Sequence, residues 1–263
     1  MPPRARGERR FAPRCAPQRG ETVRLKDKIA LITGASRGIG RASALALGRE
    51  GAIVVGVART AADLDALERE LRAAGGRGLM IEADVTRAAS VAACVERAVR
   101  ELGRIDLLVN NAGVGGYRPF LEWSEDDYDR IMATNMKGTW LFCREVIPHM
   151  RRQGGGHIIN VASVAGLQGY PNEAIYCASK FAQVGLTQAL DREFWQENIK
   201  VSAVCPGGVE THFAIGDGRT AGSERMQGFS TAEDVAEAVV LAALPRDRSR
   251  IVQIVMRPMN EAT

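Results

Sequence analysis

Short runs rich in β-branched and other apolar residues recur along the chain, and stretches of helical composition separate most of them. Strands that are apolar on both faces and joined by helices are typical of a parallel sheet with helices on both sides, and right-handed crossovers make such a sheet doubly wound. The pattern therefore predicts an α/β fold with about seven strands. The expected strands are Lys28–Thr33, Ala52–Val57, Leu79–Ala83, Ile105–Val109, His157–Ala162, Val201–Cys205 and Ile251–Val255.

The N-terminal residues differ from the rest of the chain. Of the 263 residues, 46% are hydrophobic and 25% are charged, so a single domain over residues 26–263 can bury its own core. Residues 1–25 instead carry seven arginines against Glu8 and Glu21, with few large apolar side chains. We expect them to form a disordered basic extension, which a targeting segment or a start-site artefact would explain equally well. Because the net charge of +4 is concentrated there, a nucleic-acid partner is not expected.

Three further features limit the possible partners. No apolar run is long enough to span a membrane, so no membrane partner is expected. The five cysteines lack CxxC spacing, which favours reduced thiols and a cytoplasmic location. His149, His157 and His212 are too far apart for a local zinc motif, so we expect no metal.

A glycine-rich segment follows the first predicted strand. Thr33-Gly34-Ala35-Ser36-Arg37-Gly38-Ile39-Gly40 precedes a stretch of helical composition that ends at Gly51. Glycines at this junction let the backbone approach a pyrophosphate, and the N–H groups at the start of a helix favour its charge. A Rossmann-type dinucleotide loop is the functional interpretation. A tight strand-to-helix turn without a ligand would use the same residues.

A phenol and an ammonium four residues apart form a second pattern. Tyr176 and Lys180 share one face of a helix, and Ser163 follows the fifth predicted strand. A cation about 4 Å from the phenol, at an effective dielectric constant of about 20, favours the phenolate by about 4 kcal/mol and brings the pKa from about 10 to about 7. Tyr176 would then exchange protons near neutrality. In isolation, a core tyrosine and a surface lysine would be the simpler interpretation.

Together these motifs resemble the short-chain dehydrogenase/reductase family. The similarity spans about residues 26–256 and includes TGASRGIG, Asn110-Asn111-Ala112-Gly113, Ser163, Tyr176-x-x-x-Lys180 and Pro206-Gly207, in the family's order. It implies an oxidoreductase that transfers hydride between a nicotinamide cofactor and a carbonyl or alcohol of a small molecule. The implied catalytic residues are Asn135, Ser163, Tyr176 and Lys180, with Asn135 in a predicted helix over Glu125–Arg152 and positioning Lys180 through water.

The resemblance also implies a set of cofactor-binding residues. They are Gly34, Ser36, Arg37, Gly38, Ile39, Gly40, Arg59, Asp84, Val85, Asn111, Ala112, Gly113, Tyr176, Lys180, Pro206, Gly207, Val209 and Thr211. Asp84 is expected to contact adenine, although capping the following helix would be an alternative role.

The end of the second predicted strand bears on the choice of cofactor. Ala58 stands where NAD-dependent relatives commonly have Asp, and Arg37 and Arg59 are placed to pair with a 2′-phosphate. NADP(H) is therefore the expected cofactor, with NAD(H) possible. Two solvated surface charges would be the alternative interpretation.

Several functional alternatives remain open. A 3-oxoacyl-carrier-protein reductase is one, although its relatives usually end the seventh strand in an Asp-Gly-Gly-like turn and this chain has Met256-Arg257-Pro258. A non-catalytic NADP-binding regulator is another. Residues 208–230 are expected to form a substrate lid. The apolar helix that carries Tyr176 is expected to support a homodimer or homotetramer, unless it is buried within one chain.

Overall fold

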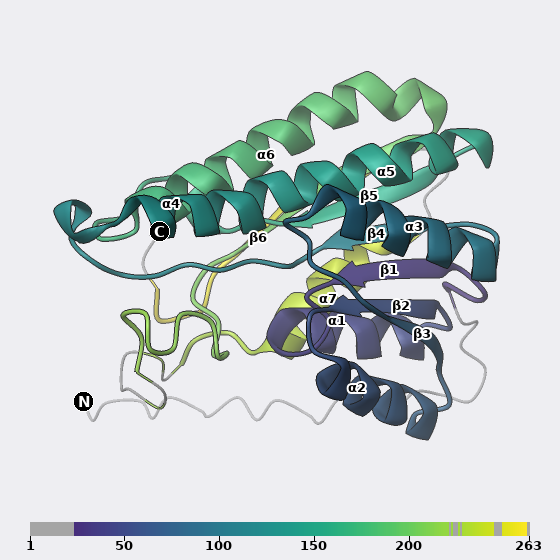
Figure 1. Ribbon diagram of the computed structural model, residues 1–263, viewed down its shortest axis with the longest axis horizontal. Helices are drawn as coiled ribbons and strands as arrows, with labels where there is room; N and C mark the ends of the chain where they lie inside the picture. Colours follow the sequence, from purple (N-terminus) through teal and green to yellow (C-terminus); the bar gives the residue numbers. More distant parts are fainter. Residues whose placement is uncertain (1–23, 221, 223–225, 227, 245–248, 262–263) are drawn as a thin grey trace, which may run out of the picture.

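The computed structural model describes residues 24–220, 222, 226, 228–244 and 249–261, and its centre is a seven-stranded sheet (Figure 1). Every neighbouring pair of strands is parallel, and the strand order is β3-β2-β1-β4-β5-β6-β7. The doubly wound Rossmann-type sheet is thus confirmed, in one domain. The strands are β1 (Ile29–Thr33), β2 (Ile53–Ala58), β3 (Arg77–Glu82), β4 (Leu107–Asn110), β5 (Gly156–Val161), β6 (Ile199–Pro206) and β7 (Gln253–Met256).

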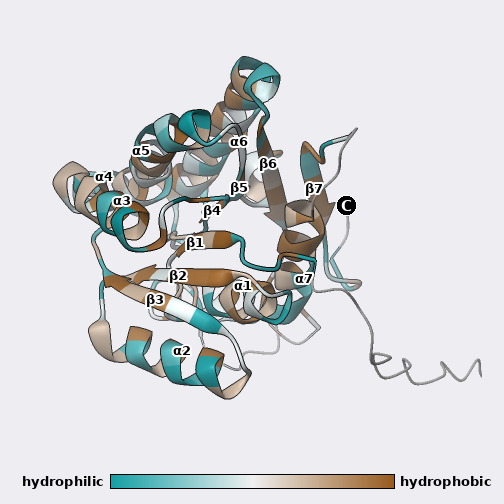
Figure 2. Ribbon diagram, turned by 90° about the vertical axis from the view of Figure 1, so that its right-hand side faces the viewer, coloured by the Kyte–Doolittle hydropathy of each residue, from teal (hydrophilic) through white to brown (hydrophobic). Residues whose placement is uncertain are grey.

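Helices cover both faces of the sheet. Figures 1 and 2 show α1, α2 and α7 on one face and α3, α5 and α6 on the other. The helices are α1 (Gly38–Arg49), α2 (Ala61–Ala73), α3 (Ala88–Leu102), α4 (Glu125–Met132), α5 (Gly138–Arg152), α6 (Ala174–Phe194) and α7 (Ala232–Ala243). Short 3₁₀ turns lie at Phe120–Glu122, Val164–Gly166 and Trp195–Glu197.

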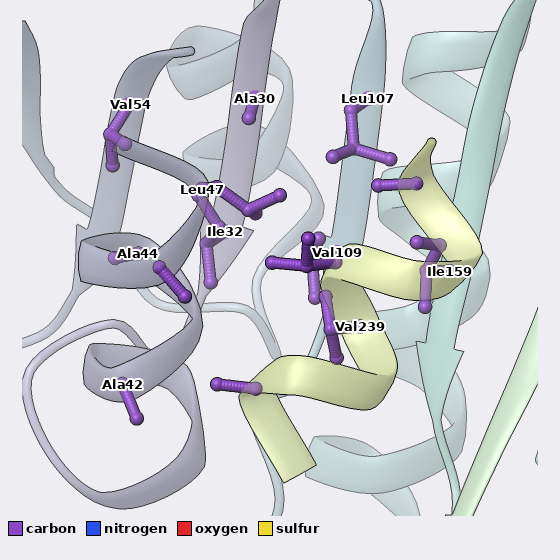
Figure 3. Close-up of a cluster of buried hydrophobic side chains, with 14 of the residues drawn as sticks. Ala30, Ile32, Ala42, Ala44, Leu47, Val54, Leu107, Val109, Ile159 and Val239 are labelled. Carbon is purple, nitrogen blue, oxygen red and sulfur yellow. The ribbon is translucent and has the colours of Figure 1, made fainter. Parts of the chain in front are cut away.

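The alternation of side chains along the strands builds two apolar cores. Ala30 and Ile32 of β1 join one cluster with α1 and α7, while Leu31 joins a second cluster with α3 and α5. Figure 3 shows the first cluster, with side chains of β1, β2, β4 and β5 directed toward the two helices. Because both faces of the strands are buried, the near-continuous apolar runs in the sequence have a direct structural cause.

The direction of the connections changes between β1 and β4. The chain passes from β1 to β2 and β3 on one side, and then returns to place β4 on the other side of β1. Ligands of doubly wound sheets bind at such a switch point, outside the carboxyl ends of the strands. Here those ends are Thr33 and Asn110.

A buried polar chain connects the central strands to α6. The Asn110 amide donates to Asn160 Oδ1 at 2.9 Å, and the Asn160 amide donates to Thr187 Oγ1 at 2.8 Å. Asn110, Asn160 and Thr187 lie on β4, β5 and α6, and all three are buried. Since buried polar groups need partners, this chain fixes the position of α6 against the sheet.

The helix expected over Glu125–Arg152 is interrupted. A π-helical turn at Ala133–Lys137 separates α4 from α5, and Asn135 lies within it. Such turns insert one extra residue per turn and are frequent at functional sites. The sequence pattern missed this turn because its apolar residues continue the helical spacing on both sides.

The start of the folded chain lies slightly before the expected boundary. Leu25, which the composition placed in the extension, is buried and its N–H donates to Glu50 O at 2.9 Å. Residues 1–23 of the expected extension lie outside the described residues. Within the described part of the chain, none of the helices is long and apolar enough to cross a membrane.

Candidate active site

The glycine-rich loop between β1 and α1 leaves no room for larger side chains. Gly34 has φ +64°, and a Cβ at Gly40 would lie 2.2 Å from Gly34 O and 2.4 Å from Asn111 Nδ2. The Asn111 amide donates to Thr33 O at 3.0 Å and to Gly34 O at 3.2 Å. The end of β4 therefore holds the loop in a shape that only glycine allows at these positions.

A single cavity of about 1110 Å³ connects this loop to the Tyr176 region. Seventeen of the eighteen expected cofactor-binding residues line it, together with Ser163. The exceptions among all expected site residues are Gly40, which packs behind the loop, and Asn135, which is buried beneath the cavity. The structure thus gathers residues from the ends of all seven strands, or from the loops that follow them, into one space.

Positive charge marks one end of the cavity. Arg37 and Arg59 both line it and are exposed, and neither forms an ion pair among the described residues. Ala58, the last residue of β2, offers no carboxylate at this end of the cavity. Two guanidinium groups with unused donors suit a phosphate better than a ribose hydroxyl.

Asp84 lies at the same end and shapes a turn. Its Oδ1 accepts from Thr86 N at 2.9 Å and from Thr86 Oγ1 at 2.7 Å, two residues before α3 begins. Burial alone would raise the pKa of Asp84, but the Thr86 hydrogen bonds and the charges of Arg59 and Arg87 hold it below its usual value. The carboxylate therefore stays ionised at the cavity wall rather than capping α3, whose N-cap is Arg87.

Ser163 and Tyr176 meet at the other end of the cavity. Ser163 follows β5, and its Oγ accepts from Ala165 N at 3.1 Å at the start of a 3₁₀ turn. The Tyr176 side chain interacts with the Ser163 hydroxyl and with the Phe213 ring, whose centroid is 5.4 Å from its own. The two hydroxyls expected to act on one oxygen are therefore neighbours.

The Tyr176 pKa is raised in this structure, in the direction opposite to the lowering by Lys180 that the sequence predicted. Burial raises the pKa of Tyr176 above its ordinary value, and the Ser163 hydroxyl and the charge of Arg219 offset only part of this effect. The Lys180 ammonium lies 5.7 Å from the Tyr176 ring centroid. Desolvation of the phenolate outweighs attraction by nearby cations, so Tyr176 is a protonated hydroxyl, ready to donate.

Lys180 is instead held by a buried polar chain. Its Nζ donates to Val161 O at 3.0 Å and to Gln183 Oε1 at 2.7 Å, and the Gln183 amide donates to Thr139 Oγ1 at 2.7 Å. Thr139 Oγ1 in turn donates to Asn135 O at 2.7 Å. Side chains, in addition to any water, thus link Lys180 to Asn135.

The side chain of Asn135 has a separate structural role. Its Oδ1 accepts from Val114 N at 2.8 Å, while its amide donates to Val114 O and Ser179 Oγ, both at 2.9 Å. It therefore ties the π-helical turn to the segment after β4 and to α6. The hydrogen-bonded chain to Lys180 begins at the Asn135 backbone carbonyl, and the positioning of Lys180 by Asn135 through water stays a prediction.

Sequence reasoning missed Gln183, Thr139 and Arg219. Gln183 follows Lys180 by three residues on one helix face, and Thr139 follows Asn135 by four, so helical spacing offered a signal for both. Arg219 lies in the segment between β6 and α7, where no periodicity marks which side chain enters the cavity. Only the tertiary structure reveals it.

Similarity to known proteins agrees with this geometry. The family model for short chain dehydrogenase matches residues 28–220. Sepiapterin reductase of Chlorobaculum tepidum is 37% identical over 240 residues, covering 88% of this chain and 96% of that protein. A metagenomic short-chain oxidoreductase in complex with NADP is 36% identical with a TM-score of 0.78, covering 90% of this chain and 99% of that chain.

A 3-ketoacyl-(acyl-carrier-protein) reductase from Brucella melitensis, complexed with NADH, is 32% identical with a TM-score of 0.81. The match covers 89% of this chain and 98% of that chain. The chain therefore belongs to the short-chain dehydrogenase/reductase family and is an oxidoreductase. The expected cofactor class, a nicotinamide dinucleotide, is thereby confirmed, while the individual binding residues stay predictions.

Metal-ligating side chains do not gather in this region. Among the residues that the structure describes, no group of three or more His, Cys, Asp or Glu side chains is placed to hold a metal ion. His157, one of the three histidines, is buried with its Nε2 2.7 Å from Ser202 Oγ, and burial lowers its pKa to about 3.

Burial of Lys180 predicts a pH dependence of stability. Burial lowers its pKa to about 8, whereas a lysine in the unfolded chain titrates near 10.4. Between these values the unfolded chain binds more protons, so the contribution of Lys180 to the free energy of unfolding rises with pH. In urea denaturation, the free energy of unfolding of wild type, taken relative to that of Lys180→Met, should rise by roughly 2–3 kcal/mol between about pH 7 and about pH 10. A difference that stays constant with pH would contradict burial of the ammonium.

Proposed function

We propose that the protein is an NADP(H)-dependent oxidoreductase that interconverts a carbonyl and an alcohol of a small molecule. The observation that carries this proposal is the pairing of Ser163 with a protonated Tyr176 in a cavity whose far end carries Arg37 and Arg59. The family, the cavity and the glycine loop all suit a dinucleotide. When bound, the nicotinamide supplies or accepts the hydride.

The residues of the chain handle the proton and the developing charge. Ser163 Oγ hydrogen-bonds the substrate oxygen and stabilises the negative charge that forms on it. Tyr176 donates its hydroxyl proton to that oxygen in reduction, and in the reverse reaction its phenolate takes the proton of the alcohol. The Lys180 ammonium, held by Gln183 and Val161, stabilises the phenolate that reduction leaves behind.

A preference for NADP(H) over NAD(H) rests on three neighbouring residues. Arg37 and Arg59 provide donors for a 2′-phosphate, and Ala58 lacks the carboxylate that would bind a ribose 2′-hydroxyl and repel that phosphate. The charge of Arg59 also lowers the pKa of Asp84. Two arginines and one carboxylate give the adenosine end of the cavity a net positive charge.

A substrate lid over about residues 208–230, of which residues 221, 223–225 and 227 lie outside the described part of the chain, belongs to the proposal. Val209 and Ser230 form a parallel bridge, so the two ends of the segment meet. Gly216 and Gly218 have positive φ values, and Phe213 contacts Tyr176. These features let the segment cover the substrate end of the cavity while its base stays fixed.

Replacing Tyr176 by Phe removes the proton donor and keeps the ring. We expect carbonyl reduction with NADPH to fall by about 10²–10⁴-fold, with NADPH affinity within a few-fold of wild type. NADPH oxidation against a panel of ketones and aldehydes measures the first quantity, and fluorescence titration measures the second. Tyr128→Phe is the matched control, because Tyr128 is exposed on α4 outside the cavity and should retain wild-type turnover.

Two alternative functions give different results in the same assay. A regulator would bind NADPH without any turnover that Tyr176→Phe removes. A reductase of carrier-bound 3-oxoacyl groups, favoured by the similarity to the Brucella melitensis enzyme, would act on acyl-carrier thioesters far better than on free ketones. Either outcome would overturn the small-molecule proposal.

The cofactor preference predicts the effect of Arg59→Leu. Loss of a charge-assisted bond to the 2′-phosphate should lower kcat/KM for NADPH by about 10- to 100-fold and leave NADH nearly unchanged. Arg87→Leu is the control, because Arg87 also acts on Asp84 by its charge but does not line the cavity. If the ratio of kcat/KM for NADPH to that for NADH stays unchanged when Arg37 and Arg59 are both replaced by Leu, the assignment is refuted.

We also propose a cytoplasmic homodimer or homotetramer. Trp140 on α5 and Phe181 on α6 are 42% and 45% exposed, on helices that lie on the same face of the sheet (Figure 1). Light scattering should give the mass of two or four chains, and Phe181→Asp should shift it toward one chain. A wild-type mass of one chain would rule out the oligomer.

A further inference from the structure

Arg219 brings a positive charge into the substrate end of the cavity. It belongs to the segment between Val209 and Ser230 and lines the cavity near Tyr176. Its Cζ lies 5.3 Å from the Tyr117 ring centroid, 5.8 Å from that of Phe213 and 5.6 Å from that of Phe229. Three aromatic rings therefore surround one guanidinium group and hold its position.

Most hydrogen-bond donors of Arg219 remain unused within the described part of the chain. Its Nη1 donates to Val209 O at 3.3 Å, and no acidic side chain there forms an ion pair with it. A guanidinium carries five N–H donors, and aromatic ring faces attract its charge without accepting conventional hydrogen bonds in its plane. The charge is thus positioned but not neutralised.

The acidic side chains that line the same end have other partners. Asp217 accepts from Arg118 and from Arg130, the latter at 2.9 Å. Glu261 pairs with Arg257 at 2.6 Å and accepts from Gly208 N at 2.9 Å. Glu173 also lines the cavity, and no ion pair joins it to Arg219 within the described part of the chain. These carboxylates therefore do not serve as counter-ions for Arg219.

Arg219 also lies close to the reacting hydroxyl. Phe213 contacts both Arg219 and the Tyr176 ring, so the cation and the phenol share one neighbouring ring. The charge of Arg219 is among the influences that lower the pKa of Tyr176 against the effect of burial. A ligand of modest length can therefore reach both groups.

We propose that Arg219 binds an anionic group of the substrate, and that the substrate is an oxo acid or the corresponding hydroxy acid. This inference rests on the proposed function and narrows its substrate class. The carboxylate pairs with the guanidinium, while the carbonyl oxygen meets Tyr176 and Ser163. In reduction the carbonyl carbon gains hydride from NADPH, which becomes NADP⁺, and the oxygen gains the Tyr176 proton. The carboxylate is unchanged.

The competing explanation is that Arg219 only fastens the lid. Cation–π contacts with three rings would serve that purpose, and removal of the guanidinium would then impair every substrate to the same degree. A carboxylate-binding role instead predicts a selective loss. An acid and its methyl ester share the reacting carbonyl and differ mainly in charge, so their ratio separates the two roles.

The test compares 2-, 3- and 4-oxo acids with their methyl esters in wild type, Arg219→Met, Arg219→Lys and Arg144→Met. Wild type should prefer at least one acid over its ester by about 10- to 100-fold in kcat/KM, the range expected for a hydrogen-bonded ion pair. Arg219→Met should abolish that preference with little effect on the ester, and Arg219→Lys should keep part of it. Arg144 packs over Trp140 at 5.4 Å outside the cavity, so Arg144→Met should leave the preference intact.

A second readout measures binding without turnover. Calorimetric titration of the enzyme with NADP⁺ present should show tighter binding of the matching carboxylate than of its ester, and Arg219→Met should remove the difference. The inference is overturned if wild type binds and turns over acid and ester equally well, or if Arg219→Met lowers kcat/KM for both by the same factor. The inference is also overturned if Arg219→Met weakens cofactor binding and leaves the acid-to-ester ratio unchanged, since Arg219 would then bind the cofactor.

The two proposals fail in different ways. Turnover of neutral ketones without any preference for acids rejects the role of Arg219 and leaves the oxidoreductase proposal standing. Absence of turnover with every carbonyl compound rejects the proposed reaction, and the calorimetric comparison of acid with ester still decides what Arg219 binds.

Discussion

The contact between the ends of β1 and β4 supports the rest of the site. Asn111 holds the backbone of Thr33 and Gly34, and Thr33 Oγ1 accepts from the N–H groups of Asn111 and Ala112 at 3.0 Å each. This mutual arrangement closes the switch point of the sheet around a glycine loop. Gly40 packs so tightly beneath it that a methyl group would displace the loop. The nucleotide end of the cavity exists because these backbones can approach so closely.

The catalytic end depends on polar groups that are buried and hydrogen-bonded to one another. Asn110, Asn160 and Thr187 fix α6, while Gln183 and Thr139 connect Lys180 to the π-helical turn. Low local polarity strengthens each of these bonds, and it also keeps Tyr176 protonated. The same burial therefore orders the site and favours transfer of the proton from Tyr176 to the substrate.

Charge divides the cavity into two functional ends. Arg37 and Arg59 line the nucleotide end, and Arg219 lines the other end together with Tyr176 and Ser163. Asp217 is committed to Arg118 and Arg130, which ties the segment before α7 to the region around α4. A cation at each end is what the proposed pairing of a phosphorylated cofactor with an anionic substrate requires.

The sequence by itself determined the sheet, the glycine loop and the positions of Ser163, Tyr176 and Lys180, because strand and helix periodicities and short motifs are local properties. The number of strands follows from apolar runs that must be buried on both faces, whereas their order in the sheet came from the structure. Tertiary structure alone decided the π-helical turn at Asn135, the partner of Lys180, the protonated state of Tyr176 and the entry of Arg219 into the cavity. Each of these depends on desolvation and on contacts between residues far apart in the chain. Local sequence patterns predict neither.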